Sequence, residues 1–270
     1  MRAQGTGRGL AVYAMFYLAF LYAPIFLLPV FSFNDNTFVT FPLKGMTGAW
    51  YAEMAGNAQL GNALRSSLMI VVPVALISTG LGLMAALALG RSPIRFKAAI
   101  LALLMAPLVV PTLVLGVSLL TLLRGVFGFD LSLATVAAGH ILLCLPYAVV
   151  ILLARLEGFD RSLEEASLDL GQSGFATFRR ITLPLMMPAI VASLLLCSVV
   201  SFDEFLLAFF LSGSDATLPL YIWGSLRFPA KLPSTLALGS CLLVFSIAVV
   251  VFAEWVRRRG TGGAGAVTGL

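Results

Sequence analysis

Six apolar runs, each about 20 residues or longer, constrain this chain more than any other feature of its sequence. One crossing of the bilayer's hydrocarbon layer, which is about 30 Å thick, takes about 20 helical residues. Inside that layer there is no water, so the backbone N–H and C=O groups must form hydrogen bonds with one another, and such runs therefore fold as helices. We therefore predict an all-α, polytopic membrane protein with six transmembrane helices, at residues of about 10–31, 65–89, 98–120, 133–153, 187–211 and 234–256.

The few charged residues support this prediction and suggest an orientation. Only 11% of residues are charged and 60% are hydrophobic, with a mean hydropathy of +1.02, which excludes an ordinary soluble domain. The net charge of +5 gives no reason to expect nucleic-acid binding, because twelve of the seventeen basic residues fall on one predicted side. Lys and Arg concentrate on the cytoplasmic side, so both termini are expected there. The twelve are Arg2, Arg8, Arg91, Arg95, Lys97, Arg155, Arg161, Arg179, Arg180, Arg257, Arg258 and Arg259.

Residues that serve catalysis or metal binding are scarce. The single histidine, His140, excludes a zinc motif with several histidines, and it is expected to pack or cap within the fourth span. Cys144, Cys197 and Cys241 lie in apolar runs, where cysteine behaves as a small core residue. No catalytic residues, bound metal or cofactor are therefore expected in this chain. An intramembrane enzyme is a weak alternative, because the sequence also lacks a GxSxG nucleophile motif.

The loop of about 154–186 is the longest charged interruption between two apolar runs. Ser162 and Glu165 have the spacing of a capping box, which predicts that a helix begins there. Gly171 permits the turn that ends it. So short a helix needs support, either from a groove on another protein or from the lipid surface, for its apolar face. That face comprises Leu163, Ala166 and Leu170.

The same loop carries a spacing pattern of high specificity. Glu165-Ala166-Ser167, three residues, Gly171, nine residues, Ile181, one residue and Leu183-Pro184 resemble the EAA signature of permease subunits of bacterial ABC importers. Ser167 stands where the family pattern has a third alanine, a change between small residues. The resemblance implies that this loop is a cytoplasmic coupling helix, in which Glu165, Ala166, Ser167 and Gly171 contact an ATPase subunit and Leu183 and Pro184 lead into the fifth span.

The resemblance also implies a set of partners. The chain has no GxxxxGK[ST] phosphate-binding loop, so ATP and Mg are expected to bind a partner ATPase. The family implies a second, non-identical permease subunit, two copies of a cytoplasmic ATPase subunit and a periplasmic substrate-binding protein, all assembled at the bacterial inner membrane. The expected organisation is a cytoplasmic N-terminus at 1–9, a permease domain at 10–256 and a flexible cytoplasmic tail at 257–270.

Shorter matches in the same order resemble the second permease subunit of spermidine/putrescine importers. They are YAP at Tyr22, SFN at Ser32, WY at Trp50, APLVVP at Ala106 and SFDEF at Ser201. The resemblance implies transport of a small cationic solute such as putrescine or spermidine. A passive channel is also compatible with six spans, but a channel has no evident need for an ATPase-docking helix.

Two adjacent acids, Asp203 and Glu204, lie inside the predicted fifth span. A carboxylate at the bilayer centre costs roughly 2.5 to 3.5 kcal/mol, so this pair is predicted to border a pathway that attracts a cation. The alternative is that both acids are hydrated or ion-paired near the outer interface. Ser201 adds a hydroxyl to the candidate pathway, and Trp50 and Tyr147 add aromatic faces.

Thr112 marks a departure from the polyamine permeases. That family tends to carry an acid directly after the proline that is Pro111 here, whereas this chain has Thr112. The missing carboxylate leaves importers of other small organic solutes open, among them opine, aminophosphonate and thiamine importers.

Overall fold

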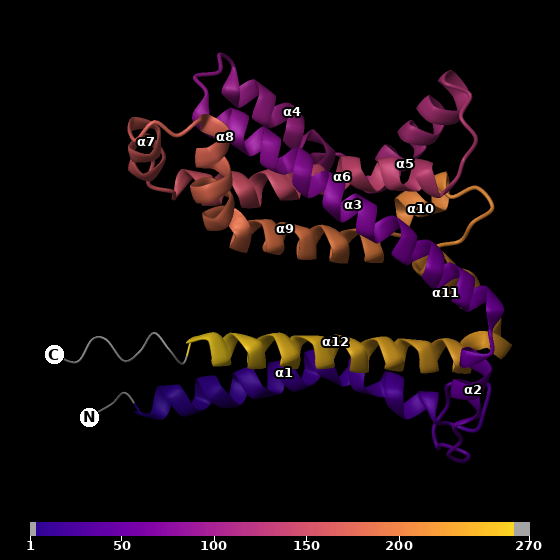
Figure 1. Ribbon diagram of the computed structural model, residues 1–270. Coiled ribbons are helices and arrows are strands. Elements are labelled where there is room, and N and C mark those ends of the chain that lie inside the picture. Colours follow the sequence, from indigo (N-terminus) through magenta and orange to yellow (C-terminus); the bar gives the residue numbers. More distant parts are fainter. Residues whose placement is uncertain (1–3, 262–270) are drawn as a thin grey trace. The chain divides into compact units, whose positions relative to one another are not determined.

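A computed structural model describes residues 4–261, with side chains described for 9–248 and for 251 (Figure 1). Every regular element in that range is a helix, apart from one isolated bridge between Asn34 and Met46. The chain forms two compact units, Met1–Ala58 with Ile222–Leu270, and Gln59–Tyr221. The predicted tail begins inside the last helix, which continues to Thr261, and residues 1–3 and 262–270 lie outside the described range.

The first unit is built on two long helices from opposite ends of the chain. Helix α1 (Gln4–Ser32) packs along α12 (Leu232–Thr261), and the short α2 (Ala49–Ala55) also packs on α12. A 3₁₀ turn, η3 (Pro229–Lys231), leads into α12, and α11 (Leu218–Ser225) crosses the boundary between the units.

The second unit holds the remaining elements around one buried core. They are α3 (Ala58–Arg91), α4 (Lys97–Val109), α5 (Thr112–Leu120), the π-helical η1 (Thr121–Val126), α6 (Leu133–Glu157), α7 (Ser162–Asp169), α8 (Gly174–Thr177), the π-helical η2 (Phe178–Thr182), α9 (Leu183–Asp203) and α10 (Leu206–Leu211).

Small residues allow the helices of this unit to approach closely. A Cβ added to Gly82 of α3 would lie only 2.6 Å from the Cβ of Ala148 on α6. Such close backbone approach is a common way to pack helices in lipid, where hydrocarbon removes most of the hydrophobic drive between them. Val74, Leu152 and Met186 are fully buried in the core that results.

The number of spans agrees with the sequence prediction. Five helices are long and apolar enough to cross a membrane, and a sixth span is counted if the bent pair of α4 with α5 and η1 crosses as one. The predicted span at 98–120 is strongly bent, because α4 and the helix that follows meet at 97°. Pro111 has no N–H for a helix and disfavours helical geometry in Val110, which is extended at φ −74° and ψ 128°.

The fifth span also differs from its prediction at both ends. Instead of covering 187–211, the continuous helical segment runs from Gly174 to Asp203. Glu204 is extended at φ −72° and ψ 112°, and its carboxylate accepts a hydrogen bond from the backbone N–H of Leu207 (3.1 Å). This bond satisfies an amide in the first turn of α10, so a new helix begins where the sequence predicted a continuous one.

Candidate functional site

Helix α7 begins at Ser162, as the sequence predicts, but the expected capping box is absent. The residue at the N-cap is Arg161, and the N–H of Ser162 donates to Asp160 Oδ1 (3.0 Å). That bond holds the pKa of the Asp160 carboxyl below its usual range, because it stabilises the ionised form. The aspartate just before the helix provides the cap, since its short side chain reaches an amide two residues ahead.

The end of α7 is as predicted. The helix finishes at Asp169, and Gly171 turns the chain with φ +81°, a left-handed conformation that glycine adopts without steric cost. The predicted apolar face of the helix is uncovered in the described chain. Leu163 is 47% exposed and Leu170 is 83% exposed, and Ala166 and Glu165 are exposed beside them. This face is available to another molecule.

Ser167 and Glu164, which lie next to that face on the helix, anchor α7 to the chain that follows it. The hydroxyls of Ser167 and Thr177 lie 2.9 Å apart and are buried. Thr182 donates its hydroxyl hydrogen to Glu164 Oε1 (2.6 Å). The sequence suggested a contact to an ATPase for Ser167, and it attached no role to Glu164. The structure places both side chains inward, and no local spacing signal could have revealed their distant partners.

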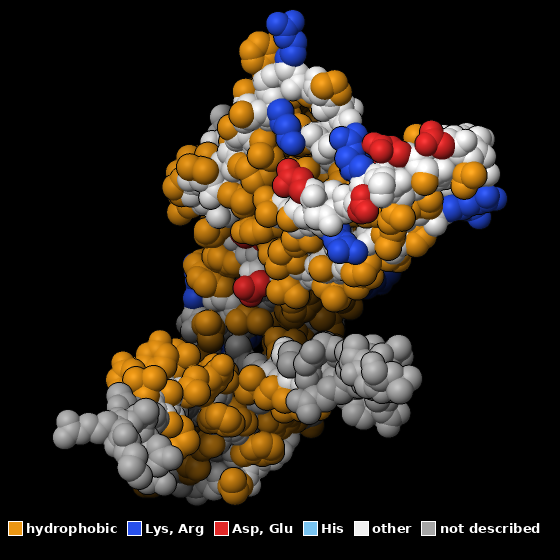
Figure 2. All heavy atoms as spheres, turned by 90° about the vertical axis from the view of Figure 1, so that its left-hand side faces the viewer, with side chains coloured by type: hydrophobic (Ala, Val, Ile, Leu, Met, Phe, Trp, Pro, Cys, Tyr) orange, Lys and Arg blue, Asp and Glu red, His pale blue; other side chains and the backbone are white. Residues whose placement is uncertain are grey.

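Charged side chains gather around this loop. Arg91, the last residue of α3, places Nε 3.0 Å from Glu164 Oε2. Lys97 and Glu157 form a longer and more exposed pair, with Nζ 3.7 Å from Oε1. Figure 2 shows acidic and basic side chains grouped at this end, with hydrophobic side chains around them. Leu183 and Pro184 open α9 directly after η2, inside the continuous helical segment that begins at Gly174.

The two acids predicted to border a pathway lie where α9 stops. Asp203 is the last residue of α9 and is exposed, whereas Glu204 is half-buried and lies outside the helix. The expectation of two adjacent helical positions is therefore wrong. Neither carboxylate is paired with a basic side chain within Gln59–Tyr221, in contrast to Glu164.

The other candidate pathway residues have different environments. Ser201 is buried, and its Oγ lies 2.9 Å from His140 Nδ1, so this hydroxyl faces α6 and confirms that His140 packs in its span. Tyr147 is half-buried on α6, and Thr112 is half-buried at the start of α5, directly after the bend. Trp50 belongs to the other unit, where its indole N–H donates to the carbonyl oxygen of Asn34 (2.9 Å).

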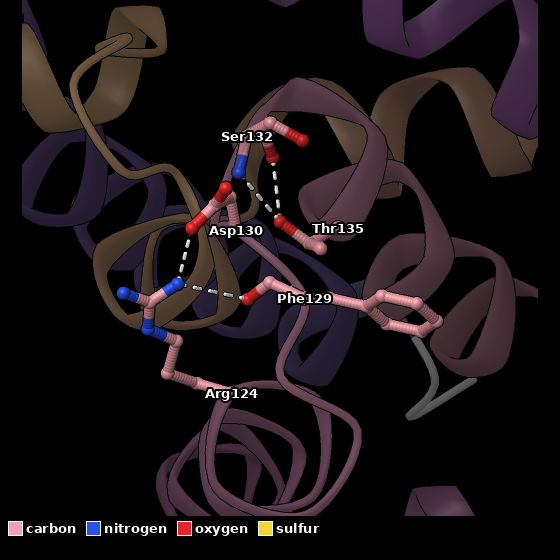
Figure 3. Close-up of polar contacts among 5 residues, drawn as sticks. All are labelled: Arg124, Phe129, Asp130, Ser132 and Thr135. Atoms are coloured by element: carbon pink, nitrogen blue, oxygen red, sulfur yellow. Dashed lines mark hydrogen bonds and ion pairs between the residues drawn. The ribbon is translucent and has the colours of Figure 1, made fainter.

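A compact turn precedes α6 (Figure 3). Arg124 of η1 points toward Asp130, with which it forms an ion pair, and toward the carbonyl oxygen of Phe129. The N–H of Ser132 donates to the hydroxyl of Thr135 (2.8 Å), and that hydroxyl also lies 2.8 Å from the carbonyl oxygen of Leu211. These contacts fix the start of α6 against the end of α10.

No group of three or more metal-binding side chains occurs among the residues that the structure describes. The candidate site consists of the exposed face of α7 and of two acids, Asp203 and Glu204, that have no basic partner within Gln59–Tyr221. This arrangement suits docking and cation attraction.

Comparison with known proteins identifies the family. Residues 78–261 match the family described as binding-protein-dependent transport system inner membrane component. The chain belongs to this family. Membership confirms the resemblance drawn from Glu165 to Pro184, and it makes the chain a permease subunit of an ABC importer.

Relatives of this permease are similar over most of its length. It is 36% identical over 248 residues to the spermidine/putrescine transport system permease protein PotC of Shigella flexneri, covering 92% of this chain and 93% of that one. It is also 36% identical over 244 residues to the putrescine transport system permease protein PotI of Escherichia coli K12, covering 87% and 85%. A bacterial ABC transporter for import of the polysaccharide alginate has a chain with the same fold, at a TM-score of 0.71 and 16% identity, covering 96% of this chain and 98% of that chain.

Proposed function

We propose that this permease forms half of the translocation pathway of an ATP-driven importer for a small cationic solute, a polyamine such as putrescine or spermidine. The observation that carries the proposal is the exposed face of α7, held between two spans in a chain 36% identical to polyamine permeases. A helix presented in this way fits a groove on a soluble subunit.

The family implies the partners, and the exposed face of α7 supports the first of them. A cytoplasmic ATPase subunit, present in two copies and binding ATP and Mg, takes the face formed by Leu163, Ala166 and Leu170, with Glu165 beside it. A second permease subunit completes the pathway, and a periplasmic binding protein delivers the solute. In support, one solved relative of the same fold is an alginate transporter in complex with its periplasmic protein, at a TM-score of 0.70. Both termini of this chain then lie in the cytoplasm, together with α7.

The substrate class rests on Asp203 and Glu204. Two carboxylates at a helix break, without a basic partner inside their own unit, attract a solute that carries several ammonium groups. Thr112 lies at a second helix break, at the start of α5, and contributes no charge. A different small organic solute is therefore the second outcome of a binding measurement on the cognate periplasmic protein. Failure of that protein to bind putrescine or spermidine would exclude the polyamine assignment.

Replacement of Glu165 by alanine tests the docking. We expect normal membrane insertion with transport and stimulated ATP hydrolysis reduced about tenfold, since a charged contact at an interface is lost. Asp169→Ala, at an exposed acid on the same helix, is the matched control and should behave as wild type. Wild-type activity of the Glu165→Ala variant in reconstituted vesicles would contradict the assignment.

A further inference from the structure

One carboxylate joins three elements of the second unit. Glu164, in the first turn of α7, places Oε2 3.0 Å from Arg91 Nε at the end of α3. Its other oxygen accepts a hydrogen bond from Thr182, the last residue before α9 (2.6 Å). The side chains of Arg91 and Glu164 are only 18% and 17% exposed. Glu164 thereby connects α7 to the end of α3 and to the start of α9.

Among the residues that the structure describes, Glu164 is the one acidic partner of Arg91. Its guanidinium carbon lies 5.2 Å from the ring centre of Phe159. Its Nε and Nη2 are buried without a hydrogen-bond partner in the part of the chain that the structure describes, so the contact of Nε with Glu164 is an ion pair only. A buried cation that loses its only carboxylate is left uncompensated, which is far more costly than losing an exposed pair. Glu164 and Arg91 therefore hold each other in place.

An open surface pocket of about 200 Å³ lies beside Glu164, bounded by Leu87 of α3, Leu168 of α7 and Phe178 of η2. At the edge of this pocket, the ion pair of Glu164 with Arg91 connects α7 directly to the end of α3.

We propose that Glu164 and Arg91 are positioning residues that transmit displacement of α7 to α3 and α9. The inference rests on the proposed function, in which an ATPase subunit moves the exposed face of α7. When α7 is displaced, its ion pair with Arg91 displaces the end of α3, and its hydrogen bond with Thr182 displaces the start of α9. Glu165 contacts the ATPase subunit on the exposed side of α7, and Glu164 transmits the displacement to the rest of the unit.

The experiment uses the whole transporter reconstituted in vesicles, with solute uptake and ATP hydrolysis measured together. Glu164→Gln keeps an acceptor for Thr182 but loses the charge, and Arg91→Gln removes the partner. In both variants we expect uptake per ATP hydrolysed to fall about tenfold, within the range of coupling between distant sites. The ATPase subunit should still copurify, because the docking face is intact.

Two further variants separate coupling from folding. The charge-reversed double variant R91E/E164R should restore most of the uptake per ATP. Glu157→Gln breaks the more exposed pair with Lys97 and should leave that ratio unchanged.

An unchanged ratio in both single variants would overturn the inference and leave the proposed function standing. So would loss of the assembled complex in both single variants without recovery in the double variant, because the pair would then serve folding alone. Failure of an ATPase subunit to copurify with the wild-type chain would instead overturn the proposed function.

Discussion

The two ends of α9 use carboxylates in different ways. At its start, Glu164 is largely buried and is held by Arg91 and Thr182. At its other end, Asp203 is exposed, and Glu204 accepts a hydrogen bond from the backbone of the first turn of α10. Near the start of α9, Glu164 is therefore paired within the fold. At the other end, Asp203 and Glu204 have no basic partner in the same unit.

This difference indicates which acids act within the protein and which act on a solute. A paired carboxylate fixes the position of the elements around it, and its charge is cancelled locally. Carboxylates without a basic neighbour keep their attraction for a cation. We therefore expect substitutions at the first end to affect stability and coupling, and substitutions at the second to affect the solute.

Glu164→Ala should be the most damaging single change. It leaves Arg91 buried without an anion and removes the acceptor of the Thr182 hydroxyl. The expected loss is about 3 kcal/mol of stability, measured as the thermal unfolding of the purified transporter in detergent. Glu157→Ala is the control at an exposed pair and should cost less than about 1 kcal/mol. Equal losses of stability in Glu164→Ala and Glu157→Ala would show that Glu164 stabilises the fold no more than an exposed ion-paired acid does.

Asp203→Asn and Glu204→Gln, combined in one variant, should impair transport without impairing assembly. Glu204→Gln keeps an acceptor for the Leu207 N–H, so the helix break is preserved. Uptake of a doubly charged polyamine should fall about tenfold, equivalent to about 1.4 kcal/mol. Asp215→Asn, at an exposed acid of the same unit, is the control. Undiminished uptake would show that the acids at this end do not act on the solute.

Ser201→Ala should have a smaller effect, on stability. The substitution removes the partner of His140 Nδ1, and His140 Nε2 is already buried without a partner among the described residues. Leaving a buried polar group unpaired costs about 1 kcal/mol or more. Ser198→Ala, which removes only a bond to the carbonyl oxygen of Leu194 in the same helix, is the matched control for thermal unfolding. If Ser201→Ala changed the solute preference and left the stability unchanged, Ser201 would act in the translocation pathway and not in packing.

The smallest expected effect is at Asp160, which caps α7. The backbone N–H of Ser162 lowers the pKa of the Asp160 carboxyl, so the stabilising bond is fully present above the ordinary aspartate pKa. The stabilisation that this bond gives to α7 is lost as the pH falls through the lowered pKa of Asp160. The protection of α7 amides against hydrogen exchange, measured relative to the intrinsic exchange rate at each pH, should therefore fall in acid for the wild type. In Asp160→Ala this protection should be low at every pH, and a wild-type protection profile in that variant would contradict the cap.

Local signals predicted α7 and the number of spans, but not the ends of the spans. Gly171 ends α7 because its backbone alone tolerates the required turn. Pro111 was expected to interrupt its span, but the size of the bend was not predicted, and the break at Glu204 was missed because it lies inside an apolar run of sufficient length. Proline within a helix is common in these spans, as Pro73 and Pro146 show, so its presence does not by itself indicate a break.

The sequence by itself determined that the chain crosses a membrane and where it presents a docking helix. Both properties depend on residues close together in the chain: run length is matched to the bilayer, and the spacing from Glu165 to Pro184 is matched to a family. Only the tertiary structure decided which side of α7 faces inward. An eight-residue helix is oriented by its partners, and those partners, Arg91, Thr177 and Thr182, come from elements that fold against it from elsewhere in the sequence.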